Sequence, residues 1–278
     1  MAAEPQQFTG KVALVTGGTQ GLGETIARLL VARGASGIVV AGRSVERGER
    51  VRAEVEAAGA EALFVPAELA ELEQVRRIVA ETDRKFGRLD CLVNAAALTE
   101  RGSILDTSPE LFDRMYAVNV RAPFFLIQDA AKIMRRGGAG GTMVNILSTS
   151  SYGGQHFLAA YSSSKGALAI LTRNAAYALM SDGIRINGLN IGWMNTPGEH
   201  AIQKSAHDAP PDWLDNAGAG LPLGRLLDPA EVARATAFLL SPESHPMSGA
   251  LVDFDQSVQG AGDPPRPMIR LQDRAEGG

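Results

Sequence analysis

The sequence predicts an α/β fold, a single doubly wound domain in which a parallel sheet is flanked by helices. Short apolar runs without polar alternation recur along the chain, as expected for strands that are buried on both faces. Longer segments with helical spacing separate these runs, and this alternation produces parallel strand pairs. The 278 residues, 45% of them hydrophobic, suit one such domain with a sizeable core.

The first half of the chain supplies the first part of this alternation. Apolar runs predict strands over 12–16, 38–41, 62–65 and 89–93. Apolar residues at helical spacing, or charged segments of helical length, predict helices over 21–33, 45–58 and 71–86. In the first of these helices Leu22, Ile26, Leu29 and Leu30 repeat with the period of one buried face.

The second half continues the pattern. Strands are predicted over 142–147, 184–191 and 250–254, and helices over 109–117, 120–136, 158–180 and 228–240. Residues 195–223 interrupt it with four prolines and mixed polarity, which indicates a long substrate loop over a site. We expect a catalytic domain over 1–258 and an extended tail over 259–278, which is rich in Gly, Pro and charge.

Composition excludes several classes of function. Lys and Arg number 27 against 31 Asp and Glu, so the chain lacks the basic excess of a general nucleic-acid binder. The single cysteine, Cys91, allows neither an internal disulfide nor a thiolate-rich zinc site. No apolar run is long enough for a membrane span, and the start has no secretory pattern. We therefore expect a cytoplasmic protein without membrane or nucleic-acid partners.

A glycine-rich loop lies between the first strand and the first helix. Gly17, Gly21 and Gly23 occur there with the spacing GxxxGxG. Glycines at this place allow a tight turn and let a pyrophosphate approach the N–H groups of the helix N-terminus. The alternative is a plain glycine turn, but the position of the loop favours a dinucleotide.

The end of the second strand indicates which dinucleotide is preferred. A carboxylate about 20 residues beyond the glycine loop binds the free 2′-hydroxyl of an adenosine ribose. Here the strand ends in Gly42, Arg43 and Ser44, without a carboxylate, and Arg43 can pair with a 2′-phosphate. The alternative is a solvated arginine at a helix start. We predict that NADP(H) is preferred, with NAD(H) possible.

A tyrosine and a lysine open the long helix at 158–180. Tyr161 and Lys165 are four residues apart and share one helical face, where a cation favours the phenolate. Ser148 follows the fifth strand at the edge where ligands of such sheets bind, and its hydroxyl can hold a carbonyl oxygen. Each signal alone is modest, because helical pairs and loop serines are common.

In order and spacing, these motifs resemble those of the short-chain dehydrogenase/reductase family, a Rossmann-type fold, over roughly residues 11–256. The segment 92–97 resembles the family's Asn-Asn-Ala-Gly motif, and 184–187 its sixth-strand motif. The resemblance implies that the catalytic residues are Asn119, Ser148, Tyr161 and Lys165. It implies cofactor contacts from Gly17, Thr19, Gln20, Gly21, Leu22, Gly23, Arg43, Ser44, Glu68, Leu69, Asn94, Ala95, Ala96, Tyr161, Lys165, Gly192, Met194 and Thr196.

The resemblance also implies a mechanism. Hydride passes between nicotinamide and a carbonyl carbon, Ser148 polarises the oxygen, and Tyr161 exchanges the proton. Lys165 lowers the pKa of Tyr161, and Asn119 kinks a helix and holds a relay water, with no metal required. The expected substrate is a small alcohol or ketone of the polyol or sugar kind, held by residues such as Ser150, Tyr152, His156, Trp193 and Asn195. A ketoacyl thioester reductase and a non-catalytic dinucleotide sensor are the alternatives.

The long helix at 158–180 also bears on assembly. Its apolar residues are distributed around much of the circumference, which is typical of a helix that is buried on more than one side. The sheet covers one side, and subunits of the resembled family commonly pair through this helix and the preceding one. We therefore expect a homotetramer.

Overall fold

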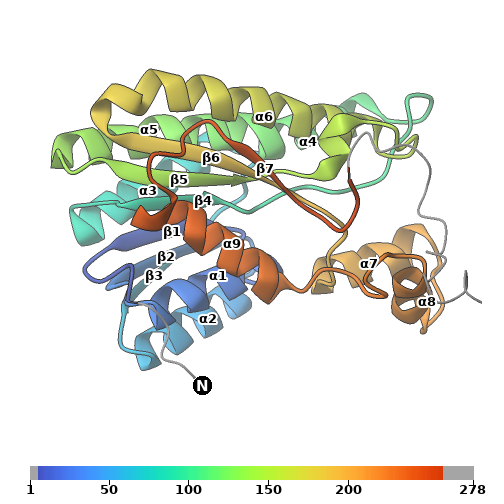
Figure 1. The fold of residues 1–278 in the computed structure, drawn as a ribbon, viewed down its shortest axis with the longest axis horizontal. Coiled ribbons are helices and arrows are strands. Elements are labelled where there is room, and N and C mark those ends of the chain that lie inside the picture. The colour runs from blue at the N-terminus through green and yellow to red at the C-terminus, as the bar shows by residue number, and fades with distance from the viewer. Residues whose placement is uncertain (1–5, 259–278) are drawn as a thin grey trace, which may run out of the picture.

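The computed structural model describes residues 6–258, and the predicted tail at 259–278 lies outside the described residues. A single sheet of parallel strands, in the order β3-β2-β1-β4-β5-β6-β7, forms the centre of the molecule (Figure 1). Its strands are β1 (Val12–Thr16), β2 (Gly37–Gly42), β3 (Glu61–Pro66), β4 (Cys91–Asn94), β5 (Gly141–Ile146), β6 (Ile184–Ile191) and β7 (Leu251–Phe254). The predicted doubly wound α/β fold is confirmed.

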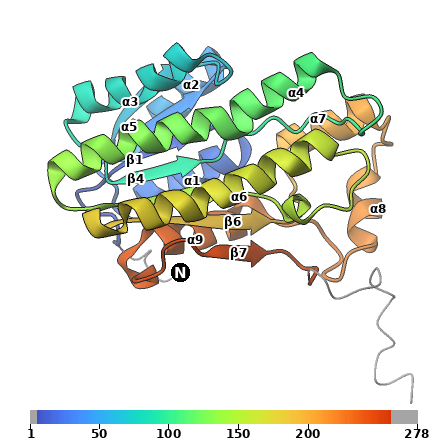
Figure 2. The same cartoon turned by 90° about the horizontal axis from the view of Figure 1, so that it is seen from above.

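Helices cover both faces of this sheet (Figures 1 and 2). One face carries α1 (Gly21–Ala32), α2 (Val45–Ala57) and α9 (Pro229–Leu240). The other carries α3 (Leu72–Phe86), α4 (Pro109–Tyr116), α5 (Ala122–Gly137) and α6 (Ala159–Leu179). Among residues 6–258, no helix is both long and apolar enough to cross a membrane.

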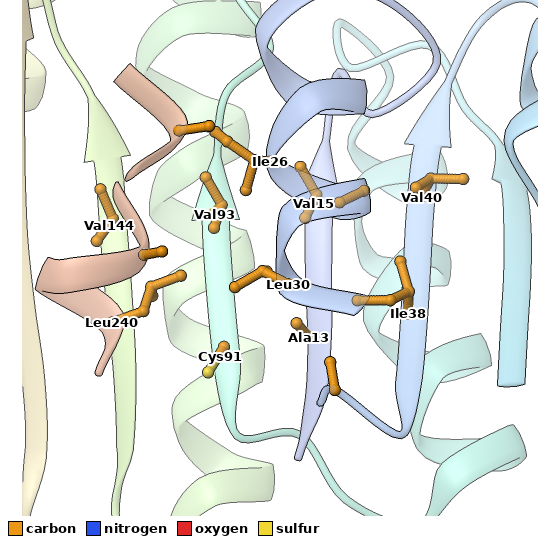
Figure 3. Packing of buried hydrophobic residues seen from close by; sticks show 14 of the residues in the cluster. Ala13, Val15, Ile26, Leu30, Ile38, Val40, Cys91, Val93, Val144 and Leu240 are labelled. Atoms are coloured by element: carbon orange, nitrogen blue, oxygen red, sulfur yellow. The ribbon is translucent and has the colours of Figure 1, made fainter. Parts of the chain in front are cut away.

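Apolar side chains from the central strands and their covering helices form the core. Val15, Val40 and Val93 project from adjacent strands toward Ile26 and Leu30 of α1, and all five are buried (Figure 3). A second cluster on the opposite face joins the strands to α3, α5 and α6. Because each central strand packs on both faces, its sequence is apolar throughout rather than alternating.

Local capping explains where several helices begin. The hydroxyls of Ser44 and Ser108 accept hydrogen bonds from backbone N–H groups in the first turns of α2 and α4. Asp228 and Glu231 form a reciprocal capping box at the start of α9. These side chains satisfy backbone donors that a helix N-terminus otherwise leaves unpaired.

The structure differs from the predicted elements in two places. The predicted helices at 109–117 and 120–136 form a continuous helical path, because a π-helical turn over Ala117–Arg121 joins α4 to α5. The segment 195–223 contains α7 (Pro197–Ala206) and α8 (Trp213–Ala219). In both views these two helices lie beyond the sheet end to which the strand arrows point (Figures 1 and 2).

Candidate active site

The glycine loop follows β1 at the carboxyl end of the sheet. Gly17 and Gly21 have φ angles of +69° and +55°, which favour glycine. A Cβ on Gly23 would lie 2.3 Å from the Gly17 carbonyl oxygen, so α1 approaches the loop more closely than a side chain allows. Gln20 precedes α1 without a side-chain capping bond. The first N–H groups of α1 are therefore suited to receive an anion.

Two further residues of the predicted cofactor loop are packed into the protein interior. Thr19 and Leu22 are both buried, and Leu22 belongs to the core beneath α1. A Cβ on Gly42 would lie 2.8 Å from the Thr19 Cγ2 atom. Thr19 thus fixes how closely the end of β2 approaches the glycine loop.

The residues after β2 meet those after β3. Arg43 is 76% exposed and its Nη1 atom lies 3.8 Å from the Glu68 carboxylate. Ser44 uses its hydroxyl oxygen to cap α2, accepting a hydrogen bond of 3.4 Å from the Arg47 N–H. Leu69, next to Glu68, is buried. Arg43 can therefore turn toward an anion, in competition with Glu68.

The end of β4 adjoins the glycine loop. A Cβ on Gly17 would lie 2.9 Å from the backbone nitrogen of Ala96, so the two backbones are in close contact beside Ala95. Asn94 is buried and its Nδ2 atom donates a 2.8 Å hydrogen bond to Asn145 Oδ1. The Asn94 Oδ1 atom is buried without a hydrogen-bond partner, which leaves an acceptor at this edge of the sheet.

Ser148, Tyr161 and Lys165 converge at the end of β5. Ser148 is buried just after the strand, and its side chain is a hydrogen-bond partner of the Tyr161 phenol. Lys165 is 2% exposed, its Nζ atom lies 5.8 Å from the centre of the Tyr161 ring, and it donates a 2.7 Å hydrogen bond to the Ile146 carbonyl. The structure thus brings the three residues together.

Burial governs the protonation of this group. It raises the pKa of Tyr161 above its usual value, and the hydrogen bond with Ser148 lowers that pKa only in part. Burial also lowers the pKa of Lys165 to about 8. Desolvation of the phenolate outweighs the lowering by Ser148 and Arg101, so the pKa of Tyr161 lies above its usual value. The expected lowering of this pKa by Lys165 stays a prediction.

Asn119 lies in the π-helical turn between α4 and α5 and is buried. Its Nδ2 atom donates to the Leu98 carbonyl at 2.9 Å and to Ser164 Oγ at 3.0 Å, while its Oδ1 atom accepts from the Leu98 N–H at 2.8 Å. Asn119 therefore joins the loop after β4 to α6 at the residue before Lys165.

The end of β6 leads into α7. Gly192 packs so closely on Asp255 that a Cβ would lie 1.8 Å from the Asp255 Oδ1 atom. Met194 pairs with Leu227 in an isolated β-bridge, and Thr196 caps α7 by accepting a 3.2 Å hydrogen bond from the Glu199 N–H. A Cβ on Gly21 would lie 3.7 Å from the Thr196 Cβ atom, so the start of α7 adjoins the glycine loop.

The proposed substrate-contacting residues separate into two groups. Tyr152 points toward β7, where its hydroxyl donates a 2.8 Å hydrogen bond to Asp253, and Ser150 bonds with Gln155. His156 packs edge-on against Phe157 with ring centres 5.1 Å apart. Trp193 and Asn195 instead contact α7 through Glu199 and His200 respectively.

A polar cluster near these residues is absent from the sequence-based predictions. The Nη2 atom of Arg101 lies 3.2 Å from the Glu199 carboxylate, and both side chains are largely buried. Trp193 and Gln203 also donate to this carboxylate, and the Arg101 Nε atom lies 3.2 Å from His207 Nε2. In sequence, Arg101 and Glu199 are two charges 98 positions apart, with no shared motif to connect them.

A family model described as enoyl-(acyl carrier protein) reductase matches residues 17–257. The chain belongs to the short-chain dehydrogenase/reductase family. Members of this family are oxidoreductases that act on alcohols and ketones with a nicotinamide cofactor, so this chain is such an oxidoreductase.

Individual short-chain dehydrogenase/reductases match over nearly their whole length. An uncharacterized oxidoreductase of Thermotoga maritima is 35% identical over 89% of this chain and 97% of its own. A sorbitol dehydrogenase of Cereibacter sphaeroides is 31% identical over 86% and 93%. The solved structure of a putative betaketoacyl-ACP reductase matches with a TM-score of 0.76, at 35% identity over 90% of this chain and 98% of its own.

Proposed function

We propose that this short-chain dehydrogenase/reductase interconverts a secondary alcohol and a ketone of the small polyol or sugar kind, with NADP(H) as the preferred cofactor. The observation that carries the proposal is the convergence of Ser148, Tyr161 and Lys165 at the carboxyl end of the sheet. Ligands of doubly wound sheets bind at this end. The sorbitol dehydrogenase relative supports the choice of substrate class.

The residues present fit a dinucleotide. The Gly17–Gly23 contact leaves no room for a side chain, and the start of α1 has backbone donors without a side-chain cap. In the proposal the cofactor is held by the glycine loop, Arg43 and Ser44, Glu68 and Leu69, Asn94 to Ala96, Gly192, Met194 and Thr196, together with Tyr161 and Lys165. When bound, its nicotinamide supplies or accepts the hydride.

Tyr161 and Ser148 handle the substrate oxygen. In the reduction direction the Tyr161 hydroxyl gives its proton to that oxygen, while the Ser148 hydroxyl donates a hydrogen bond to it. The raised pKa of Tyr161 keeps the phenol protonated at neutral pH, which is the form that this step needs. Oxidation of the alcohol reverses the proton transfer.

Lys165 and Asn119 act behind Tyr161. The Lys165 ammonium, anchored on Ile146, places a positive charge beside the phenol and stabilises the phenolate left after proton transfer. Asn119 holds the loop after β4 against α6 and thereby fixes the backbone next to Lys165. In the proposal it also supports the water through which Lys165 exchanges protons with solvent.

Exposed apolar side chains support a homo-oligomer. Ile170, Tyr177 and Met180 at α6 and Phe124 on α5 are all more than 40% exposed. Such a surface is suited to pairing with a second copy of the chain. We propose a homotetramer in which this face is one of the subunit contacts.

A panel of substrates tests the proposed function. The purified protein is mixed with NADP(H) or NAD(H) and with polyols, sugars, ketoacids or ketoacyl thioesters, and the redox state of the nicotinamide is followed. We expect the highest turnover with a polyol or its ketone. A preference for thioesters would favour the alternative that the putative betaketoacyl-ACP reductase structure represents. Cofactor binding without turnover of any substrate would indicate a sensor.

A further inference from the structure

The two carboxylate oxygens of Glu199 have different surroundings. Its Oε1 atom accepts hydrogen bonds from Arg101 at 3.2 Å, Trp193 at 2.9 Å and Gln203 at 2.8 Å. Its Oε2 atom forms no hydrogen bond within residues 6–258, although the side chain is only 14% exposed. Three donors therefore fix the orientation of the carboxylate and leave one oxygen as a positioned acceptor.

The surrounding backbone places Glu199 close to the reacting groups. The residue after Arg101, Gly102, exchanges backbone hydrogen bonds with Phe157 at 2.9 Å and Ala159 at 3.0 Å, directly before Tyr161 on α6. The start of α7 adjoins the glycine loop on the other side. The two charges act in opposite directions on the pKa of Tyr161, which Arg101 lowers and Glu199 raises.

An aromatic surface accompanies the carboxylate. The rings of Trp193 and Trp213 are 6.0 Å apart at an interplanar angle of 31°, and His200 packs edge-on against Trp213 at 4.9 Å. Trp193 is 39% exposed. A carbon chain that carries several hydroxyls offers C–H groups to such rings and O–H groups to a carboxylate, so this pairing suits a polyol.

The same cluster disfavours a negatively charged substrate. All three guanidinium nitrogens of Arg101 are engaged, by His207, by the Thr99 carbonyl and by Glu199. Arg101 keeps two further N–H groups, but its charge is paired with Glu199, whose free oxygen would repel a carboxylate or a phosphate.

We propose that Glu199 determines substrate specificity by accepting a hydrogen bond from a second hydroxyl of a polyhydroxylated substrate whose first hydroxyl reacts at Tyr161. This assignment rests on the proposed function and names the group that selects the substrate class. Loss of a hydrogen bond to a charged partner reduces binding by about 10- to 150-fold. A substrate with only one hydroxyl does not use this bond and should not respond.

The test compares sorbitol with 2-hexanol in the wild type and in Glu199→Gln. The variant removes the charge, keeps the size of the side chain and retains an oxygen for the Trp193 donor. We expect kcat/KM for sorbitol to fall about 10- to 100-fold, mainly through KM, and kcat/KM for 2-hexanol to change less than about 3-fold. Glu73→Gln, at an exposed position in the first turn of α3, is the matched charge control.

A second measurement does not depend on turnover. Trp193 donates directly to Glu199, so sorbitol binding should change tryptophan fluorescence. Sorbitol is titrated into Tyr161→Phe with saturating oxidised cofactor, with and without Glu199→Gln, in a Trp213→Phe background that isolates Trp193. We expect a saturable change that Glu199→Gln shifts to at least about 10-fold higher sorbitol concentration.

Three results would overturn the assignment. The first is an equal loss of activity on both alcohols, which would make Glu199 only a support for α7. The second is a wild type that prefers 2-hexanol to sorbitol, which would also contradict the proposed polyol substrate but would leave the proposed dehydrogenase activity standing. The third is cofactor binding without turnover of any alcohol or ketone, which alone contradicts the dehydrogenase activity itself.

Discussion

Lys165 extends from α6 to the end of β5, where its ammonium donates a 2.7 Å hydrogen bond to the Ile146 carbonyl oxygen. This is the single hydrogen bond that the Lys165 side chain forms within the described residues, and the side chain is 2% exposed. A buried cation with one backbone partner is costly, which explains the lowered pKa of Lys165. The buried ammonium lies at the place where the proposed reaction needs a positive charge, despite its cost to stability.

The first prediction concerns stability and pH. The pKa of Lys165 is about 8 in the folded protein, against 10.5 for an unperturbed lysine. Below pH 8 Lys165 carries its proton in both the folded and the unfolded chain, so the folded state bears the full free-energy cost of burying the charge. Between about pH 8 and 10.5 the unfolded chain binds more protons, and the contribution of Lys165 to stability rises with pH.

Lys165→Met should therefore raise the free energy of unfolding at pH 7. The increase is at most about 3 kcal/mol, reduced by the contribution of the hydrogen bond that the substitution removes. Denaturant unfolding of both proteins from pH 7 to pH 10 measures the difference, which should shrink as the pH rises. A variant that is less stable at pH 7 and whose deficit does not change with pH would contradict the prediction. In the proposed function the variant also loses most of its activity.

The second prediction concerns the choice of cofactor. Arg43→Ala should weaken NADP(H) binding about 10-fold and leave NAD(H) binding nearly unchanged, because only NADP(H) carries the 2′-phosphate. Glu68→Gln should strengthen NADP(H) binding, since it removes the carboxylate that lies 3.8 Å from Arg43. Titration of both cofactors into the three proteins measures these effects.

The predicted preference would be contradicted if Arg43→Ala weakened the binding of both cofactors equally. It would also be contradicted if the wild type bound NAD(H) more tightly than NADP(H). Gly42→Asp, which would add a carboxylate at the end of β2, is a weaker test of the same preference. A Cβ at Gly42 would lie 2.8 Å from Thr19, so the substitution disturbs the glycine loop as well as adding a charge.

Comparison of the sequence with the structure shows which features can be predicted. The strands could be predicted from the sequence, because burial on both faces leaves uninterrupted apolar runs such as Val12–Thr16. Helices α7 and α8 could not be predicted, because prolines and mixed polarity in 195–223 hide their short helical periods. The join between α4 and α5 was also hidden, since a π-helical turn changes the spacing on which the pattern depends.

The candidate site divides in the same way. The Tyr161–Lys165 spacing and the position of Ser148 after an apolar strand could be recognised, because both are local signals. The Arg101–Glu199 pair could not, because only the folded chain brings these residues together. The raised pKa of Tyr161 arises mainly from burial, which spacing along the chain does not encode.

The cytoplasmic location stays a prediction.

The third prediction concerns assembly. Light scattering at micromolar concentration should give four times the chain mass of 29.3 kDa. Ile170→Asp combined with Tyr177→Asp, at side chains that are 58% and 84% exposed on α6, should reduce that mass. Val45→Asp, a similarly exposed apolar position on α2, is the control and should leave the mass unchanged. A wild-type monomer would contradict the proposed oligomer.

Turnover by Tyr161→Phe tests directly whether Tyr161 transfers the proton, because the substitution removes the exchangeable proton and keeps the ring. A positioned acid contributes about 10²- to 10⁴-fold to the rate, so we predict that kcat falls by this factor. Because the ring remains, the dissociation constant of the nicotinamide cofactor should change little. Ser163→Ala, on the same helix, is the control and should retain wild-type turnover. A Tyr161→Phe variant that keeps near-normal turnover would contradict the assignment of Tyr161 as the proton-transferring group.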